Sequence, residues 1–448
     1  MQQIDFSQGS IRRRILAVAT PMLIAQLLNL LYNIVDRIYI GKIPGEGTLA
    51  LASIGFPFVT LITAFANLFG LGGAPLCAMA RGKGNREGAQ GIMVNAGFML
   101  LLSGAVLTVL GIAFHRPLLY LFGASEVTYP YASSYIVIYL IGTLCVMLSL
   151  GLNPYINCQG FARTGMLTVA LGAAANIVLD PIFIFALHLG VRGAAIATVL
   201  SQFLSAAWVV KFLTGKKAEL KLDFRGFRPD CQCIQRITVL GIASFVMSFT
   251  DTLVQVACNA TLRNFGGDLY ISVMTVLNSV RQIAQTPVLA IADGASTAIS
   301  YNYGAGLYKR TRDAIRFMTQ IAIGYTMLVW MLVSLFPALF IRIFNQDAEL
   351  VAAAVPALHI YFFGFVMMAF QYAGQSTFRA LGRAKYAVFF SLLRKAFIVV
   401  PLTLLLPYCW NLGVSGVFAA EPVSNCIGGL ACYFTMRHVV MPELKMEN

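Results

Sequence analysis

Apolar stretches long enough to cross a membrane recur along the whole of this 448-residue sequence. A helix needs about 20 mainly apolar residues to cross the hydrocarbon core of a bilayer. Here 58% of the residues are hydrophobic and only 11% are charged, which excludes an ordinary soluble globular protein. We predict twelve helical spans, at approximately residues 15–39, 50–76, 90–113, 131–152, 164–187, 192–213, 237–262, 269–292, 314–340, 352–374, 385–407 and 413–436.

Basic residues concentrate in alternate connections between these spans. Short cytoplasmic loops retain Lys and Arg, so this pattern places both termini on the cytoplasmic side of the plasma (inner) membrane. Orientation and contact with anionic membrane lipids account for the net charge of +14, and nucleic acid is not an expected partner. The basic connections contain Arg12–Arg14, Arg81–Arg86, Lys216–Arg228, Lys309–Arg312 and Arg379–Lys385, whereas GKIPGEG (41–47) and WNLG (410–413) are poor in basic residues.

The sequence also contains an internal repeat with an offset of 222 or 223 residues. LFGASE (121–126) corresponds to IFNQDA (343–348), YLIG (139–142) to YFFG (361–364), GVRGAAIA (190–197) to GVSGVFAA (413–420), and RGKG (81–84) to YGAG (303–306). Six spans are therefore duplicated. Because six is even, both copies enter the membrane from the same side, so an axis along the membrane normal relates them. We predict an all-α integral membrane protein with two pseudo-symmetric six-helix lobes, residues 1–213 and 237–448, joined by a cytoplasmic linker, 214–236.

Four motifs, in this order and within twelve spans, resemble the multidrug and toxic compound extrusion (MATE) transporters. They are Pro21 with Asp36 fifteen residues later, ANIVLDP (175–181), SYNYGAG (300–306), and the pair QGFARTG (159–165) and QSTFRALG (375–382). The resemblance implies a carrier, without a cofactor, that exports amphipathic and often cationic organic compounds in exchange for H⁺ or Na⁺. We expect it to act as a monomer.

Acidic residues inside the apolar spans mark candidate functional sites, because a charge at the bilayer centre costs about 2.5–3.5 kcal/mol on insertion scales. Asn176 and Asp180 are one helical turn apart and share a face. With Asp36 and Thr198 they match the cation site in the first lobe of the family, and their oxygens suit a proton relay or a hard cation such as Na⁺. Two alternatives remain open: Asp180 acts only as a local cap beside Pro181, or Asp36 pairs with Arg37.

Further polar residues allow two interpretations. Asn153 corresponds to a polar cavity position in relatives, but Asn before Pro is often only a helix cap. Asp251 lies where some relatives carry a second cation-binding acid; those relatives also have an acid in the tenth span, which is absent from IYFFGFVMMAFQYAG (360–374). Internal ion pairs are therefore the favoured interpretation of the charges in the second lobe. These charges are Asp251, Arg281, Arg394, Lys395 and Glu421.

Two other functions compete with cation-coupled export. One is a flippase for lipid-linked oligosaccharides, in the same superfamily. The other is a membrane-embedded enzyme, which is disfavoured because the sequence has only four His and no recognisable cluster of catalytic or metal-binding residues within the spans.

Overall fold

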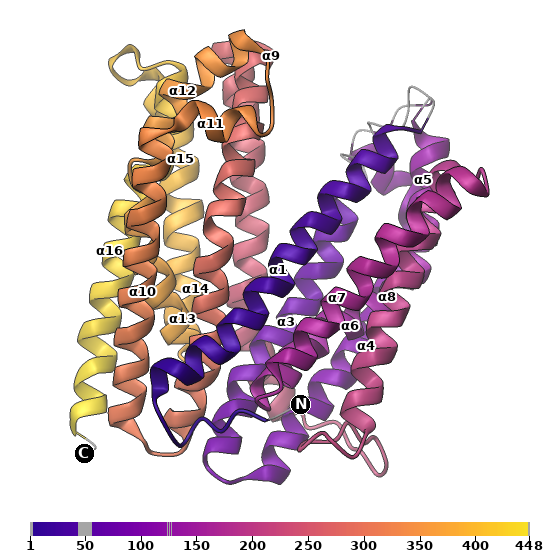
Figure 1. Ribbon diagram of the computed structural model, residues 1–448, viewed down its shortest axis with the longest axis vertical. Coiled ribbons are helices and arrows are strands. Elements are labelled where there is room, and N and C mark those ends of the chain that lie inside the picture. Colours follow the sequence, from indigo (N-terminus) through magenta and orange to yellow (C-terminus); the bar gives the residue numbers. More distant parts are fainter. Residues whose placement is uncertain (1–2, 44–55, 123, 125, 127, 447–448) are drawn as a thin grey trace. The chain divides into compact units, whose positions relative to one another are not determined.

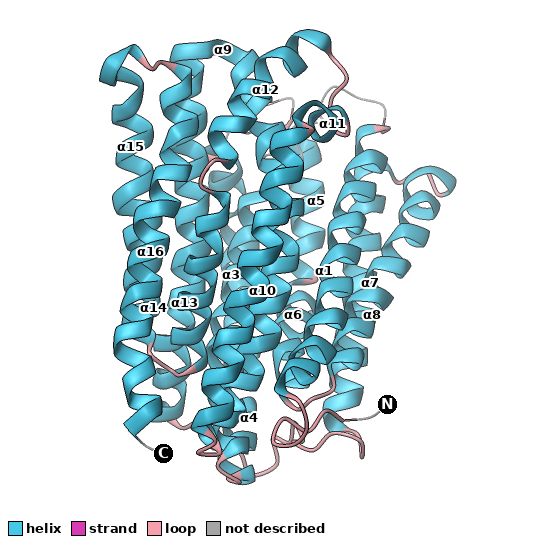
Figure 2. Ribbon diagram, turned by 60° about the vertical axis from the view of Figure 1, so that its left-hand side comes forward, coloured by secondary structure: helices cyan, strands magenta, loops and turns pink. Residues whose placement is uncertain are grey.

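The computed structural model describes residues 3–43, 56–122, 124, 126 and 128–446, and this part of the chain is helical without β-strands (Figures 1 and 2). Residues 44–47 of GKIPGEG and 50–55 of the second predicted span lie outside the described residues. The helices are α1 (Ile11–Gly41), α3 (Phe56–Gly82), α4 (Arg86–Leu121), α5 (Tyr129–Ile141), α6 (Thr143–Cys158), α7 (Ala162–Pro181), η1 (Ile182–Ala186), α8 (Gly190–Thr214), α9 (Cys231–Gly304), α10 (Tyr308–Leu335), α11 (Pro337–Arg342), α12 (Ala348–Phe362), η2 (Phe365–Met367), α13 (Met368–Ala380), α14 (Ala384–Leu392), η3 (Leu393–Val399), α15 (Val400–Leu405), η4 (Leu406–Asn411) and α16 (Val414–Met446).

Most of the predicted spans are recognisable as apolar helices. Among the described residues, 8 helices are long and apolar enough to cross a membrane, or up to 10 when each bent pair is one span. The seventh and eighth predicted spans lie in α9, where the non-helical Gly267 (φ 65°, ψ −162°) separates two helices, and the twelfth corresponds to α16. The fold class is confirmed, whereas the number twelve stays a prediction.

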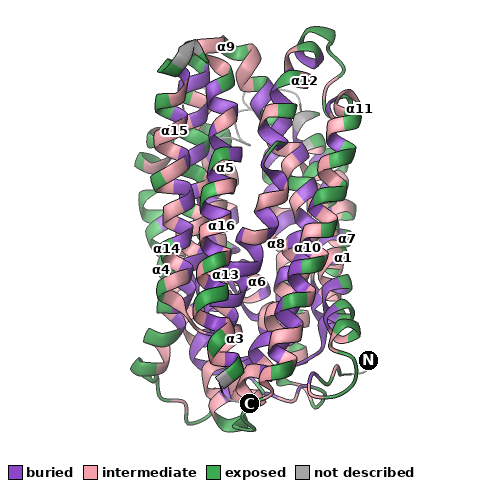
Figure 3. Ribbon diagram, turned by 90° about the vertical axis from the view of Figure 1, so that its left-hand side faces the viewer, coloured by how far each residue is buried: buried purple, intermediate pink, exposed green. Residues whose placement is uncertain are grey.

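Two compact units make up the chain, and each has its own core. Unit 1 comprises Met1–Asp5 and Thr20–Phe245, and unit 2 comprises Phe6–Ala19 and Val246–Asn448. In unit 1, α3, α4 and α6 pack together around buried side chains such as Met93 and Tyr155. In unit 2, α13 packs against α10 and α16, where Phe378 and Phe418 are buried. Buried and exposed residues occupy neighbouring positions along the helices (Figure 3), as expected when one side packs and the other faces lipid.

The predicted linker, 214–236, folds onto unit 1. Leu220 is fully buried, and its backbone N–H donates to Gln159 Oε1 at 2.9 Å. The carboxylate of Glu219 pairs with Arg81 at the end of α3. The predicted lobe boundaries stay a prediction, because compactness is a different criterion from the repeat that defines the lobes.

The start of the chain also divides between the units. The backbone N–H of Ile4 donates to Gly160 O at 3.1 Å within unit 1. In unit 2, Phe6 packs on Tyr301, and Arg310 Nη2 donates to Phe6 O at 3.0 Å. Residues 6–19 therefore group with unit 2, although the sequence assigns them to the first lobe.

The internal repeat is visible in the backbone. Three glycine pairs at the repeat offset adopt left-handed conformations: Gly84 and Gly306 (φ 74° and 71°), Gly160 and Gly382 (88° and 70°), and Gly190 and Gly413 (54° and 51°). Side chains with a β-carbon rarely adopt such φ values, so the same turns recur in both halves. The YLIG and YFFG motifs also coincide with bends, of 54° between α5 and α6 and 41° between α12 and the 365–380 helix.

Candidate functional site

The candidate cation site lies within unit 1, where α7 ends. Pro181 has no backbone N–H, and after it the chain continues as the π-helical turn η1. π-Helical turns are frequent at functional sites, because they redirect side chains within an otherwise regular helix. Asp180 immediately precedes Pro181 in the last turn of α7 and is fully buried, at 0% exposure.

Asn176 connects the polar side chains of α7 and α8. Its Nδ2 donates to Asp180 Oδ1 at 3.2 Å and to Thr198 Oγ1 at 3.4 Å. Asn176 and Thr198 are almost as buried as Asp180. The structure therefore brings three of the four predicted residues into one hydrogen-bonded group, and Asp180 has partners beyond its own backbone.

Asp36, on α1, is the fourth member of this group. Its carboxyl group interacts with that of Asp180 both electrostatically and within hydrogen-bonding range. Two carboxyl groups can approach so closely only when a proton or a cation lies between them, because two bare carboxylates repel each other. Such a pair titrates as one coupled unit.

Three tyrosines complete the group, and sequence reasoning did not identify them. Tyr32 and Tyr135 lie near the side chain of Thr198, and the Tyr139 ring stacks on Tyr135 with centroids 6.2 Å apart. All three interact electrostatically with Asp36. One signal was available for Tyr32, which precedes Asp36 by four residues and so shares its helical face.

Two buried side-chain oxygen atoms of α7 accept no hydrogen bond from the residues that the structure describes. They are Asp180 Oδ2 and Asn176 Oδ1. An unsatisfied buried acceptor is costly, and a proton or a hard cation would satisfy both by direct contact. The donor set of carboxyl, amide and hydroxyl oxygens therefore fits either H⁺ or Na⁺.

Asn153 lies within α6, not at its end. The helix runs from Thr143 to Cys158 through Pro154, so the alternative that Asn153 caps a helix is wrong. Its side-chain oxygen faces α7, where a β-carbon added to Gly165 would lie 2.8 Å from it. Its predicted role in a substrate cavity stays a prediction.

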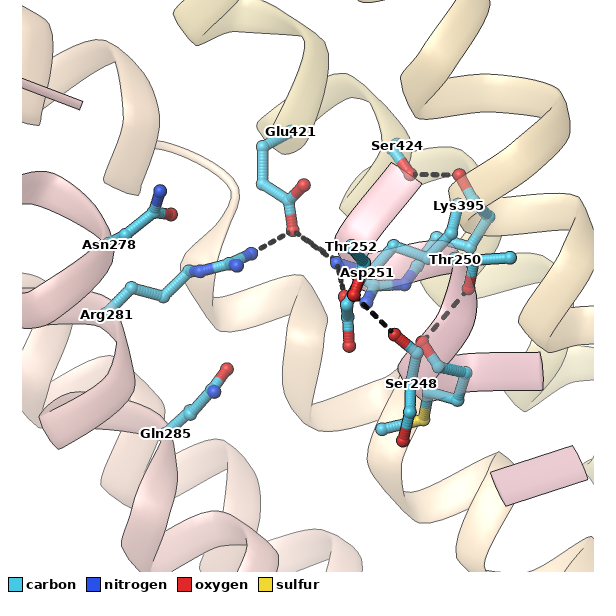
Figure 4. A network of polar contacts seen from close by, with 12 residues as sticks. Ser248, Thr250, Asp251, Thr252, Asn278, Arg281, Gln285, Lys395, Glu421 and Ser424 are labelled. Carbon is cyan, nitrogen blue, oxygen red and sulfur yellow. Dashed lines mark hydrogen bonds and ion pairs between the residues drawn. The ribbon is translucent and has the colours of Figure 1, made fainter. Parts of the chain in front are cut away.

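The charges of the second predicted lobe meet inside unit 2, and we refer to Asp251, Arg281, Arg394, Lys395 and Glu421 as the charge cluster (Figure 4). Glu421 Oε1 lies 2.7 Å from Arg281 Nη1, 3.2 Å from Arg394 Nη1 and 3.7 Å from Lys395 Nζ. Lys395 Nζ also lies 2.7 Å from Asp251 Oδ1. The predicted internal ion pairs are therefore present, while the predicted role of Asp251 in a substrate cavity stays untested.

Comparison with known proteins identifies the family. The family model MatE matches residues 21–182 and 243–405, which together exceed half of the chain. The chain belongs to the MATE family. It is therefore a multi-pass membrane transporter, and the alternative of a membrane-embedded enzyme is set aside because the family and its relatives are transporters.

Individual relatives of this MATE-family chain are distant but cover nearly all of it. The multidrug export protein MepA of Staphylococcus haemolyticus is 24% identical over 434 residues, covering 97% of this chain and 95% of the relative. An FAD transporter of Shewanella oneidensis is 24% identical over 444 residues, with 96% of each chain covered. A structure described as the outward-facing conformation of a multidrug resistance MATE family transporter has a TM-score of 0.93 at 23% identity, covering 100% and 99% of the two chains. This structural likeness establishes the fold.

Proposed function

We propose that this protein is a cation-coupled antiporter that exports amphipathic organic compounds across the plasma membrane by alternating access. The single observation that carries the proposal is the Asp36–Asp180 carboxyl pair in unit 1, with unsatisfied buried oxygens beside it. The MepA relative, a multidrug export protein, supports organic compounds as the cargo. Their often cationic character is part of this proposal and follows from the family resemblance. We further propose that the chain acts as a monomer with both termini in the cytoplasm.

Coupling follows from the charge of this pair. With a proton or Na⁺ bound, the two carboxyl groups attract the same cation and hold α1 close to α7. When the cation leaves, the carboxylates repel each other, so the two loading states favour different packing of unit 1. A ligand shifts a conformational equilibrium only by its difference in affinity for the two states, and this charge change supplies such a difference.

Efflux of a fluorescent cationic dye, such as ethidium, from loaded proteoliposomes tests the proposal. We expect Asp36→Asn and Asp180→Asn each to abolish gradient-driven efflux while the protein still inserts, because each removes one carboxylate of the pair. Asp251→Asn, in unit 2, serves as the matched control and should retain part of the activity. Normal transport by Asp180→Asn together with complete loss in Asp251→Asn would contradict the assignment.

The coupling ion is tested by imposing a pH gradient and a Na⁺ gradient separately. Na⁺ needs several oxygen ligands, so Asn176→Ala should abolish Na⁺-driven efflux by removing Oδ1. A proton needs only the carboxyl pair, so pH-driven efflux should survive Asn176→Ala in part. Dye efflux that neither gradient stimulates in the wild type would refute cation coupling itself.

A further inference from the structure

The charge cluster of unit 2 contains more positive than negative charge. Three cations, Arg281, Arg394 and Lys395, contact two carboxylates, Glu421 and Asp251. Excess charge at membrane depth is unfavourable, and a structural ion-pair network would be expected to balance. The excess of one cation is therefore a feature that bundle stability alone does not explain.

The two carboxylates are held very differently. Glu421 is 5% exposed, and one of its oxygens contacts all three cations. Asp251 has a single ion-pair partner among the described residues, Lys395, and its side chain is 45% exposed. Glu421 is thus the fixed counter-ion of the cluster, whereas Asp251 lies at its exposed edge, where water can solvate its carboxylate once another anion takes its place on Lys395.

Local backbone geometry directs two adjacent cations into this cluster. Arg394 and Lys395 are consecutive and both buried, which is unusual because neighbouring residues of an α-helix point in different directions. They lie in the π-helical turn η3, and Ser424 Oγ donates to Arg394 O at 3.0 Å, satisfying the backbone there. The structure therefore holds a closely spaced pair of cations in place.

Neutral donors flank the cluster on α9. Asn278, Arg281 and Gln285 are spaced by three and four residues, so they share one face of the helix, as Figure 4 shows. Tyr361 OH donates to Asn278 Oδ1 at 3.0 Å, and Tyr372 OH donates to Gln285 Oε1 at 3.4 Å. With the amide oxygens used in this way, both side chains present their NH₂ groups as donors.

Arg281 is the more open of the two arginines. Its side chain is 19% exposed, against 7% for Arg394, and its guanidinium lies 5.6 Å from the centre of the Tyr361 ring. A guanidinium carries five N–H donors, and Glu421 takes one through Nη1. Arg281 can therefore bind Glu421 and a second acceptor together, in the fork geometry that suits oxyanions.

We propose that the charge cluster binds an oxyanion, a carboxylate or a phosphate group, carried by the exported compound. The inference rests on the proposed export function and extends its substrate class to compounds with an anionic group. The oxyanion binds Lys395 and Arg281 in place of Asp251, which turns towards solvent, while Glu421 stays on Arg394. Asp251 keeps its charge at the exposed edge of the cluster, so the three cations then lie beside three negative charges, counting the oxyanion.

Binding of two matched dyes tests the inference. Rhodamine B carries a carboxylate, and its ethyl ester has the same ring system without that charge. Fluorescence anisotropy would measure both affinities for the full-length protein in phosphatidylcholine nanodiscs. Hydrogen bonds to charged groups are worth about 1.5–3 kcal/mol, so we expect the carboxylate to bind roughly tenfold or more tightly than the ester.

Variants separate recognition from folding. Lys395→Met should remove the preference for the carboxylate, whereas Asp251→Asn should increase it, because the competing carboxylate is gone. Arg379→Gln is the matched control, since Arg379 pairs with Asp293 elsewhere in unit 2 and should leave the preference unchanged. Equal wild-type affinity for the two dyes, or equal loss of carboxylate binding in Asp251→Asn and Lys395→Met, would overturn the inference.

Two further measurements identify the source of the oxyanion and separate the test of the oxyanion site from the test of cation-coupled export. If phosphatidylglycerol in the nanodiscs abolishes the preference, a lipid phosphate occupies the same site; if it has no effect, the site is selective for the dissolved compound. Gradient-driven efflux of the ester should persist in Lys395→Met. Absence of that efflux in the wild type would refute the proposed coupling, while the binding measurements would still decide the oxyanion site.

Discussion

Glu421→Gln tests how strongly the charge cluster depends on its buried counter-ion. In the wild type a single oxygen, Glu421 Oε1, lies within 2.7 to 3.7 Å of three cationic nitrogens. Glutamine keeps the size and one acceptor oxygen but removes the negative charge. Arg281 and Arg394 then lose their common carboxylate, and Lys395 keeps only Asp251.

The expected loss of stability is large. Removing one partner of a buried ion pair typically costs about 3–5 kcal/mol, because the remaining charge stays buried without compensation. For a domain of 150–250 residues, 1 kcal/mol lowers the midpoint of thermal unfolding by about 2–4 °C. We therefore expect Glu421→Gln to lower the midpoint by about 6–20 °C.

Asp251→Asn provides the matched comparison. Its carboxylate is 45% exposed, and after the substitution Lys395 keeps Glu421 at 3.7 Å, so the midpoint should fall by clearly less than in Glu421→Gln. Both variants would be purified in one detergent and unfolded at one heating rate, with the midpoint followed by tryptophan fluorescence. Unchanged unfolding of Glu421→Gln, or an equal effect of both variants, would refute this account of the cluster.

Two other features give further predictions. A β-carbon at Gly241 would lie 1.8 Å from Leu68 O, so Gly241→Ala should strongly destabilise unit 1. A β-carbon at Gly91 would meet open space, so Gly91→Ala should leave stability unchanged or raise it slightly. The midpoint of thermal unfolding measures both effects. Cys409 and Cys231 are both exposed, and the predicted topology places them on opposite sides of the membrane. A membrane-impermeant maleimide added to intact cells should therefore label Cys409 and not Cys231, and the reverse pattern would invert the topology.

The sequence was sufficient to predict the fold class and part of the candidate site. Membrane-spanning helices follow from local composition, since every backbone polar group must be satisfied within the bilayer. The contact between Asn176 and Asp180 follows from a spacing of four residues within one helix. The internal repeat was also detectable in the sequence, and the structure adds left-handed turns at matching positions, such as Gly160 and Gly382.

Other features depend on how separate helices are rotated and spaced against one another, which no local pattern specifies. Tyr135 and Tyr139 join Asp36 only because α5 presents them to α1 and α8. Opposite charges in unit 2 suggested ion pairs, but the convergence of three cations on one oxygen of Glu421 required α9, η3 and α16 to meet. The π-helical turn that directs Arg394 and Lys395 inward has no signature in the apolar pattern around it. Periodicity determines which side of a helix is buried, whereas tertiary packing determines which partners that side meets.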